Sequence, residues 1–184
     1  PCFAGIFEGN GHTISGLQIT ASGSALGLFR YIQSSGTVQN LTVSGDVLPD
    51  GDGSRCGILA GANYGRILNC SVNGRVKGSE ETGGICGINE ASGEIRGSSS
   101  SAAVTGEHYT GGICGINKGT LNNCTNTGAV NTHSTNVSYS LEDITLENLQ
   151  DFNSTENMAA HTDTGGITGY SEGKIYYCTN SGTV

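Results

Sequence analysis

Two identical octets contain the residues that first suggest chemistry in this sequence. TGGICGIN occupies residues 82–89 and again residues 110–117, and TGGITGY follows at residues 164–170. Glycine-rich segments cradle phosphates where a strand leads into a helix, and the P-loop form also needs a lysine followed by Ser or Thr. Here each octet precedes another turn and a strand-like run, and that lysine is absent. Nucleotide binding is therefore disfavoured, which leaves a cysteine site or a structural repeat.

Seven cysteines could support redox or metal chemistry: Cys2, Cys56, Cys70, Cys86, Cys114, Cys124 and Cys178. None forms a CxxC pair, and no Cys/His spacing fits a zinc site. Stacked parallel strands bring equivalent Cα atoms within disulfide range, but side chains that leave in the same direction suit the disulfide torsion poorly. We expect the thiols to be small core fillers, with Cys86 and Cys114 close together but reduced.

Acidic residues recur shortly before the octets, at Asp50, Asp52, Glu80, Glu81, Glu107 and Asp163. Their carboxylates could bind calcium, and PDGDGS makes Asp50 and Asp52 the candidate ligands. An EF-hand loop starting at Asp50 would need a glutamate where Gly61 stands. A solvated acidic edge is the interpretation that we favour, so no metal or other cofactor is assigned.

A carbohydrate-active enzyme needs paired carboxylates, or a basic residue with acids, in a long groove. Asp46, Arg75 and Asp163 are the residues that could be neighbours on one face, but aromatic residues for sugar stacking are few, at 6%. We expect this chain not to be an enzyme, and no catalytic residue is assigned.

Composition excludes several classes of partner. The 184 residues carry a net charge of -8, with only 8 basic residues, so nucleic acid is not an expected partner. No apolar run reaches the roughly 18–20 residues that span a bilayer, so membrane insertion is not expected. The chain starts within a motif, at PCFAGIF. We therefore expect a fragment of a longer protein, whose neighbouring segments are its intramolecular partners.

A repeat explains the octets as parts of a larger unit. One glycine per unit, at Gly36, Gly65, Gly93, Gly119 and Gly173, gives spacings of 29, 28, 26 and 54 residues. Two residues further on stand Val38, Ile67, Ile95, Leu121 and Ile175, and the apolar octet position holds Phe29, Leu59, Ile85, Ile113 and Ile167. Short β-branched runs separated by Gly, Asn and Ser predict strands rather than helices.

The repeat predicts an all-β fold, a parallel β-helix (solenoid) of about five to six coils with three short apolar stretches in each coil. Inward Val, Ile, Leu and Cys would form the core. Asn40, Asn69 and Asn123 share a column, and we expect their side chains to hydrogen-bond along the stack. We treat residues 1–184 as one domain.

The spacing of 54 marks an insertion or a degenerate coil at residues 131–163. SLEDITLENLQDF has Ser140 and Asp143 at capping-box positions, which favours an excursion with a short helix. Because the repeat fails here, we predict an interaction surface formed by Asn131, His133, Tyr139, Glu142, Asp143, Glu147, Phe152, His161 and Asp163.

GILAGANYGRILNCSVNGRV and TGGICGINKGTLNNCTNTGAV resemble the GLUG repeat, and FAGIFEGNGHTISGLQI resembles the segment that often precedes such repeats. The resemblance implies a right-handed β-helix outside the cell, in large secreted or surface-anchored bacterial proteins. These include adhesin-like proteins and the non-catalytic N-terminal region of immunoglobulin-A-specific metallopeptidases. The zinc motif HExxH of those peptidases is absent from this sequence.

The leading hypothesis is a non-catalytic structural or adhesive segment of a bacterial extracellular or cell-surface protein, with a host or matrix protein or a glycan as partner. The alternatives are an accessory substrate-recognition domain of a secreted immunoglobulin-A-type metallopeptidase and a carbohydrate-active β-helix enzyme.

Overall fold

Four parallel sheets form the walls of the molecule, where three strand segments per coil were expected. The computed structural model describes residues 2–132 and 162–184. Sheet A contains β1 (Cys2–Phe3), β5 (Phe29–Ile32), β9 (Ala60–Asn63), β13 (Cys86–Asn89), β18 (Cys114–Asn117) and β22 (Thr168–Ser171). Sheet B contains β2 (Ile6–Glu8), β6 (Thr37–Gln39), β10 (Arg66–Leu68), β14 (Glu94–Arg96), β19 (Thr120–Asn122) and β23 (Lys174–Tyr176).

The other two walls complete each coil. Sheet C contains β3 (Thr13–Ile19), β7 (Thr42–Val47), β11 (Ser71–Lys77), β15 (Ser99–Ser100), β20 (Thr125–Asn126) and β24 (Thr179–Asn180), and β16 (Ala103–Thr105) also pairs with β11. Sheet D contains β4 (Gly23–Leu26), β8 (Gly53–Cys56), β12 (Glu80–Gly83), β17 (His108–Gly111) and β21 (Thr162–Gly165). Sheets A and B are six strands deep, which agrees with the expected five to six coils.

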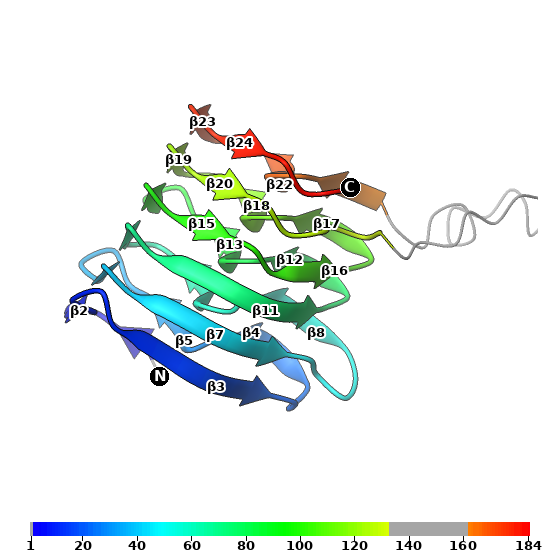
Figure 1. Ribbon diagram of the computed structural model, residues 1–184, viewed down its shortest axis with the longest axis horizontal. Helices are drawn as coiled ribbons and strands as arrows, with labels where there is room; N and C mark the ends of the chain where they lie inside the picture. Colours follow the sequence, from blue (N-terminus) through cyan, green and yellow to red (C-terminus); the bar gives the residue numbers. More distant parts are fainter. Residues whose placement is uncertain (1, 133–161) are drawn as a thin grey trace, which may run out of the picture.

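The chain winds as a right-handed parallel β-helix (Figure 1). It passes through sheets A, B, C and D in turn, and each strand pairs in parallel with its equivalent in the next coil. In Figure 1 the strands of sheet C run from left to right in front, the chain returns behind them, and each coil lies above the previous one. Neighbouring strands in such a sheet are about 4.8 Å apart.

The predicted apolar columns line the inside of the coils. Ile67 pairs with Val38 on one side and with Ile95 on the other, and Leu121 follows Ile95. All four side chains are completely buried. Each such burial contributes roughly 1.5–3 kcal/mol. The column continues to Ile175 in the last described coil, where 42% of the residue is exposed.

One predicted column was wrong by one position in the second coil. Phe29 pairs with Ala60, in the column of Cys86 and Cys114, so it does not occupy the column of Leu59. Its ring contacts two other phenylalanine rings, with centroids 5.0 Å away for Phe3 and 5.5 Å away for Phe7. This aromatic cluster fills the first coils, where the repeat departs most from its later pattern.

The strands on either side of residues 133–161 pair directly with each other. β21 joins β17 in sheet D, and β22 joins β18 in sheet A. Val130 N also donates a hydrogen bond to Thr183 O, at 2.8 Å. The two described turns that flank residues 133–161 are therefore neighbours in the stack. The short helix expected around Ser140 lies outside the described residues.

Candidate functional site

The octet is a packing unit in both copies. All eight residues of TGGICGIN are buried in each copy. A Cβ on Gly83 would lie 2.4 Å from the Cα of Cys114, and one on Gly87 would lie 2.3 Å from backbone atoms of Arg55. The glycines therefore allow the backbones of neighbouring coils to approach closely. Each octet ends a strand of sheet D (β12 or β17), turns the corner, and forms a strand of sheet A (β13 or β18).

The asparagine at the last octet position belongs to a buried asparagine ladder, which was not predicted from the sequence. Asn63 Nδ2 donates to Asn89 Oδ1 at 2.8 Å, and Asn89 Nδ2 donates to Asn117 Oδ1 at 2.9 Å. The ladder ends at Ser171 Oγ, 3.1 Å from Asn117 Nδ2. All three asparagines are completely buried. The signal in the sequence was the Asn that ends GAN and GIN at the same repeat position.

The predicted column of Asn40, Asn69 and Asn123 has a different role. These residues adopt left-handed backbone conformations, with φ values of 55°, 52° and 53°. Only one contact follows the expected ladder, from Asn69 Nδ2 to Asn40 Oδ1 at 3.5 Å. Asparagine is suited to this column because its short polar side chain tolerates the left-handed region.

All seven cysteines are free thiols, including Cys86 and Cys114, the pair that was expected to be close together but reduced. Cys86 and Cys114 are direct partners in the register of β13 and β18, and both are buried. Desolvation raises the pKa of Cys86 well above its ordinary value, and a hydrogen bond with Cys114 adds to the effect. Desolvation also raises the pKa of Cys56 to about 12 and that of Cys124 to about 12. These thiols are poor nucleophiles because the thiolate is the reactive form.

The acidic residues before the octets do not gather into one site. Asp50 and Asp52, the calcium candidates, are both exposed in the turn before β8. Glu81 pairs with Arg55 across adjacent coils, with Oε2 2.6 Å from Nε. Within residues 2–132 and 162–184, no group of three or more His, Cys, Asp or Glu side chains is arranged to hold a metal ion.

Two of the three residues considered for enzyme chemistry are neighbours. Arg75 Nη2 lies 2.6 Å from Asp46 Oδ2, between β11 and β7 of sheet C. The hydrogen bond from the Arg75 side chain lowers the pKa of Asp46. Asp163 lies in β21 of sheet D, so the three residues considered together do not belong to one sheet.

Of the predicted interaction surface, only Asn131 and Asp163 belong to the described residues. Asn131 is buried, and its side chain accepts from Gly106 N at 2.9 Å and donates to Thr164 Oγ1 at 2.8 Å. Asp163 is exposed. The remaining candidates lie outside the described residues: His133, Tyr139, Glu142, Asp143, Glu147, Phe152 and His161.

Outward-facing side chains also form columns. Small hydroxyl residues occupy one position of sheet C in six successive coils: Thr13, Thr42, Ser71, Ser99, Thr125 and Thr179. The hydroxyls of Ser71 and Ser99 are 2.9 Å apart, and those of Thr125 and Thr179 are 3.3 Å apart. The repeat therefore displays equivalent groups on the surface as well as in the core.

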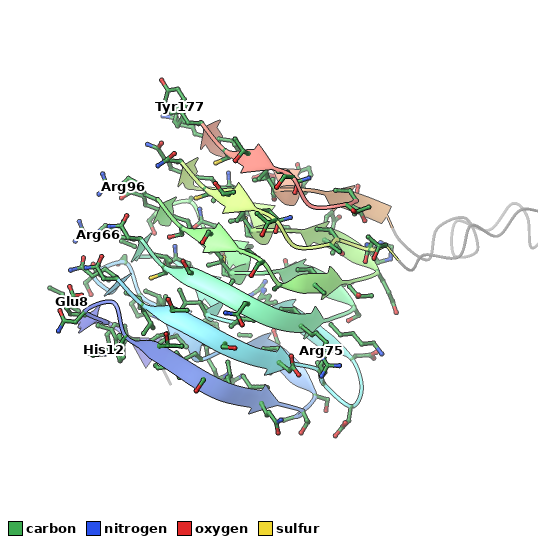
Figure 2. The ribbon with its side chains drawn as sticks, viewed as in Figure 1. Glu8, His12, Arg66, Arg75, Arg96 and Tyr177 are labelled. Carbon is green, nitrogen blue, oxygen red and sulfur yellow. The ribbon has the colours of Figure 1, made fainter. Side chains whose placement is uncertain are left out.

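A second exposed column has an aromatic end. At the outer edge of sheet B, Asn122 pairs with Arg96 below and with Tyr176 above. The left-handed residue that follows each strand is Gly97, Asn123 or Tyr177. We call Arg96, Asn122, Asn123, Tyr176 and Tyr177 the B–C edge. Figure 2 shows Tyr177 at the top of this edge, with Arg96, Arg66 and Glu8 below it.

Two relatives are similar to part of this chain. Halomucin from Haloquadratum walsbyi is 38% identical over 95 residues, which are 50% of this chain and 1% of that protein. A protein described as a Gly-rich membrane protein, from Evansella cellulosilytica, is 42% identical over 72 residues, which are 38% of this chain and 8% of that protein. The similarity is partial, and the chain spans only a small part of each relative's length.

No family model matches the chain, and no solved structure matches it significantly. The part of the chain that the structure describes contains no helix with the length and hydrophobicity of a membrane span. Together, the fold and the relatives identify a β-solenoid segment with partial similarity to two much longer proteins.

Proposed function

We propose that this chain is a non-catalytic structural and adhesive segment of a large secreted or cell-surface protein. The observation that supports this most strongly is the continuity of the columns through successive coils. A stack of repeats contacts mainly its nearest neighbours and presents an extended surface. Inward positions such as Ile95 and Leu121 hold the stack together, while outward positions repeat the same chemical groups at regular steps.

The two relatives support an extracellular or surface location. Both are far longer than this chain, since the matched regions are 1% and 8% of their lengths, and one is described as a membrane protein. The GLUG-like pattern of the repeats and the bacterial surface location that it implies are part of the proposal. The proposed partners are a host or matrix protein or a glycan.

The two alternatives from the sequence receive no specific support. An accessory domain of a secreted metallopeptidase would share the same β-helix, so the fold does not favour it over an adhesive segment. The carbohydrate-active enzyme relied on Asp46, Arg75 and Asp163, and Asp163 lies on a different sheet from the other two. We therefore propose one function.

Retention of coated beads under flow tests the adhesive function. Beads carrying the purified 184-residue chain would pass over surfaces coated with matrix proteins, mucin or neutral glycans, with albumin-coated beads as the reference. We expect retention on at least one surface, and no release of reducing sugar or cleaved peptide from it. Retention equal to albumin on every surface, or robust turnover of a substrate, would contradict the proposal.

A further inference from the structure

Tyr177 occupies a backbone position that suits asparagine or glycine. Its φ is 52°, and the equivalent residues Asn69, Gly97 and Asn123 have φ values of 52°, 61° and 53°. Bulky side chains are disfavoured in this left-handed region because the Cβ approaches the following carbonyl oxygen. The coil therefore places a tyrosine where its own repeat would be more stable with asparagine.

Packing within the chain does not account for this tyrosine. Tyr177 is 85% exposed and belongs to neither apolar cluster of the described residues. It lies in the last described coil, where inward Ile175 is also partly exposed, but the equivalent Asn69 and Asn123 are exposed in coils that have neighbours on both sides. Within those residues its ring contacts no other aromatic ring, whereas Tyr109 and Tyr170 have centroids 5.9 Å apart. A strained backbone position that holds an exposed side chain is a reason to look for a function outside the fold.

The neighbours of Tyr177 form an open polar and aromatic surface. Tyr176 precedes it and is 45% exposed. One coil below, Asn122 is partly exposed and Asn123 is exposed, and neither side-chain amide makes a hydrogen bond within the part of the chain that the structure describes. Gly97, one coil lower again, has no side chain, and the Asn69 side chain lies against it, since a Cβ on Gly97 would be 2.5 Å from Asn69 Oδ1. Figure 2 shows the Tyr177 side chain pointing away from the ribbon of the last described coil.

This combination matches the chemistry of a sugar chain. A tyrosine ring offers a flat apolar face with a polar hydroxyl, and a pyranose offers one apolar face and a rim of hydroxyls. Free amides can both donate to and accept from such hydroxyls. The two coils place the tyrosines and the amides about 4.8 Å apart along the axis, so one extended ligand can contact both levels.

The charges favour an uncharged ligand. The chain carries a net charge of -8, which repels polyanions. Arg96 is at the lower end of the B–C edge. Its Nε lies 3.5 Å from Glu94 Oε1, so the carboxylate of Glu94 balances its positive charge. Glu8, further down the stack, accepts hydrogen bonds from Gln39 at 2.6 Å and from Asn40 at 3.0 Å. Both charges therefore already have partners in the chain.

We propose that the B–C edge binds an uncharged polysaccharide, with Tyr176 and Tyr177 as stacking platforms and with Asn122 and Asn123 as hydrogen-bonding groups. This inference rests on the proposed adhesive function and names its ligand class. The residues lie in the last two coils of the described stack, away from residues 133–161.

Affinity electrophoresis in gels that contain soluble polysaccharides tests the site. The chain would be run with mannan, xylan and mixed-linkage β-glucan as uncharged ligands, and with alginate and hyaluronan as acidic ones. We expect retardation by at least one uncharged polysaccharide. Tyr177→Asn should weaken that binding at least tenfold, while its melting temperature stays equal to or above that of the wild type.

Two further variants separate binding from folding. Tyr170→Asn removes an exposed tyrosine from sheet A of the same coil and should leave binding unchanged. Asn123→Ala keeps both rings and should weaken binding several-fold without a change in melting temperature. Binding only to acidic polysaccharides, binding to none, full binding by Tyr177→Asn, or an equal loss in Tyr170→Asn would overturn the inference.

The bead assay distinguishes failure of this site from failure of the adhesive function. If beads adhere to a matrix protein and no uncharged polysaccharide retards the chain, the glycan site is wrong and adhesion stands. If beads adhere to no surface, the adhesive function itself is wrong.

Discussion

Asn89 and Asn117 form a hydrogen bond between equivalent octet positions, with Asn89 Nδ2 2.9 Å from Asn117 Oδ1. Both side chains are completely buried. An amide is costly to bury alone, but a ladder of amides satisfies each donor with the acceptor of the next coil. The repeated octet thus contributes a polar spine as well as apolar packing.

Asn89→Ala should destabilise the chain by about 1–3 kcal/mol, because it removes the middle of the ladder and leaves Asn117 Oδ1 without its donor. Thermal unfolding followed by circular dichroism measures the change. The matched control is Asn122→Ala, whose amide makes no hydrogen bond in the described part of the chain, and its effect should stay within about 0.5 kcal/mol. Equal effects of the two substitutions would contradict a structural ladder.

Gly87→Ala should destabilise the fold by about 1–3 kcal/mol through overpacking. The added Cβ would lie 2.3 Å from backbone atoms of Arg55, which cannot move without shifting the neighbouring coil. Gly5→Ala is the control, since its nearest neighbour would be a ring carbon of Phe3 at 3.8 Å. Urea unfolding should show a lower midpoint for Gly87→Ala only. A stable Gly87→Ala would mean that the coils are less closely stacked.

Buried thiols should make the fold sensitive to alkaline pH. Burial raises the pKa of Cys56 to about 12 in the folded state, whereas an unfolded thiol ionises near pH 8.5. Above that value the unfolded state has lost a proton that the folded state keeps, so stability falls by about 1.4 kcal/mol per pH unit for each such thiol. Below the pH at which the unfolded thiol ionises, the contribution of Cys56 to stability is fully present.

Urea unfolding of Cys56→Ala at several pH values tests this linkage. Between pH 9 and pH 11 the stability of the variant should fall less steeply than that of the wild type, whatever its loss at neutral pH. Cys2→Ala, which removes an exposed thiol, should keep the wild-type slope. If Cys56→Ala and the wild type have the same slope, Cys56 is not buried as described.

Arg75→Gln should raise the pKa of Asp46 towards its ordinary value, because the hydrogen bond from the Arg75 side chain holds it down. Carbonyl-detected NMR titration measures this pKa. Lys77→Gln, on the same strand, is the control and should leave it unchanged. The pair's contribution to stability is present above the pKa of the unfolded aspartate and is lost as pH falls through the lowered folded value. An unchanged Asp46 pKa in Arg75→Gln would contradict the ion pair.

The fold could be predicted from the sequence because the columns are periodic. Ile67, Ile95 and Leu121 recur at the spacing of one coil, and equivalent residues stack in a parallel solenoid. Sheet D could not be predicted in the same way. Its strands, such as EETG and TDTG, carry acidic residues and glycine, which have low strand propensity, and they pair because the flanking sheets hold them in register.

The surface was harder to predict than the core. Asn89 is of a type that is usually exposed, so its burial could not be read from its identity alone. Tyr177 looked like one aromatic residue among several. Tyr109 shares its left-handed backbone conformation, and the high exposure of Tyr177 is what separates the two. The single-residue error at Phe29 arose because this corner is one residue shorter than in the next coil: Leu26 pairs with Cys56, 30 residues further on, whereas Phe29 pairs with Ala60, 31 residues further on.

The central claim is that equivalent residues of successive repeats touch each other, including across residues 133–161. A methyl-selective NOESY spectrum of the chain tests this most directly. The register predicts contacts from Ile67 to Ile95, from Ile95 to Leu121, and from Leu121 to Ile175. Observation of all three contacts would support the stack. Contacts from Leu121 to a residue within 133–161 in place of Ile175 would contradict it.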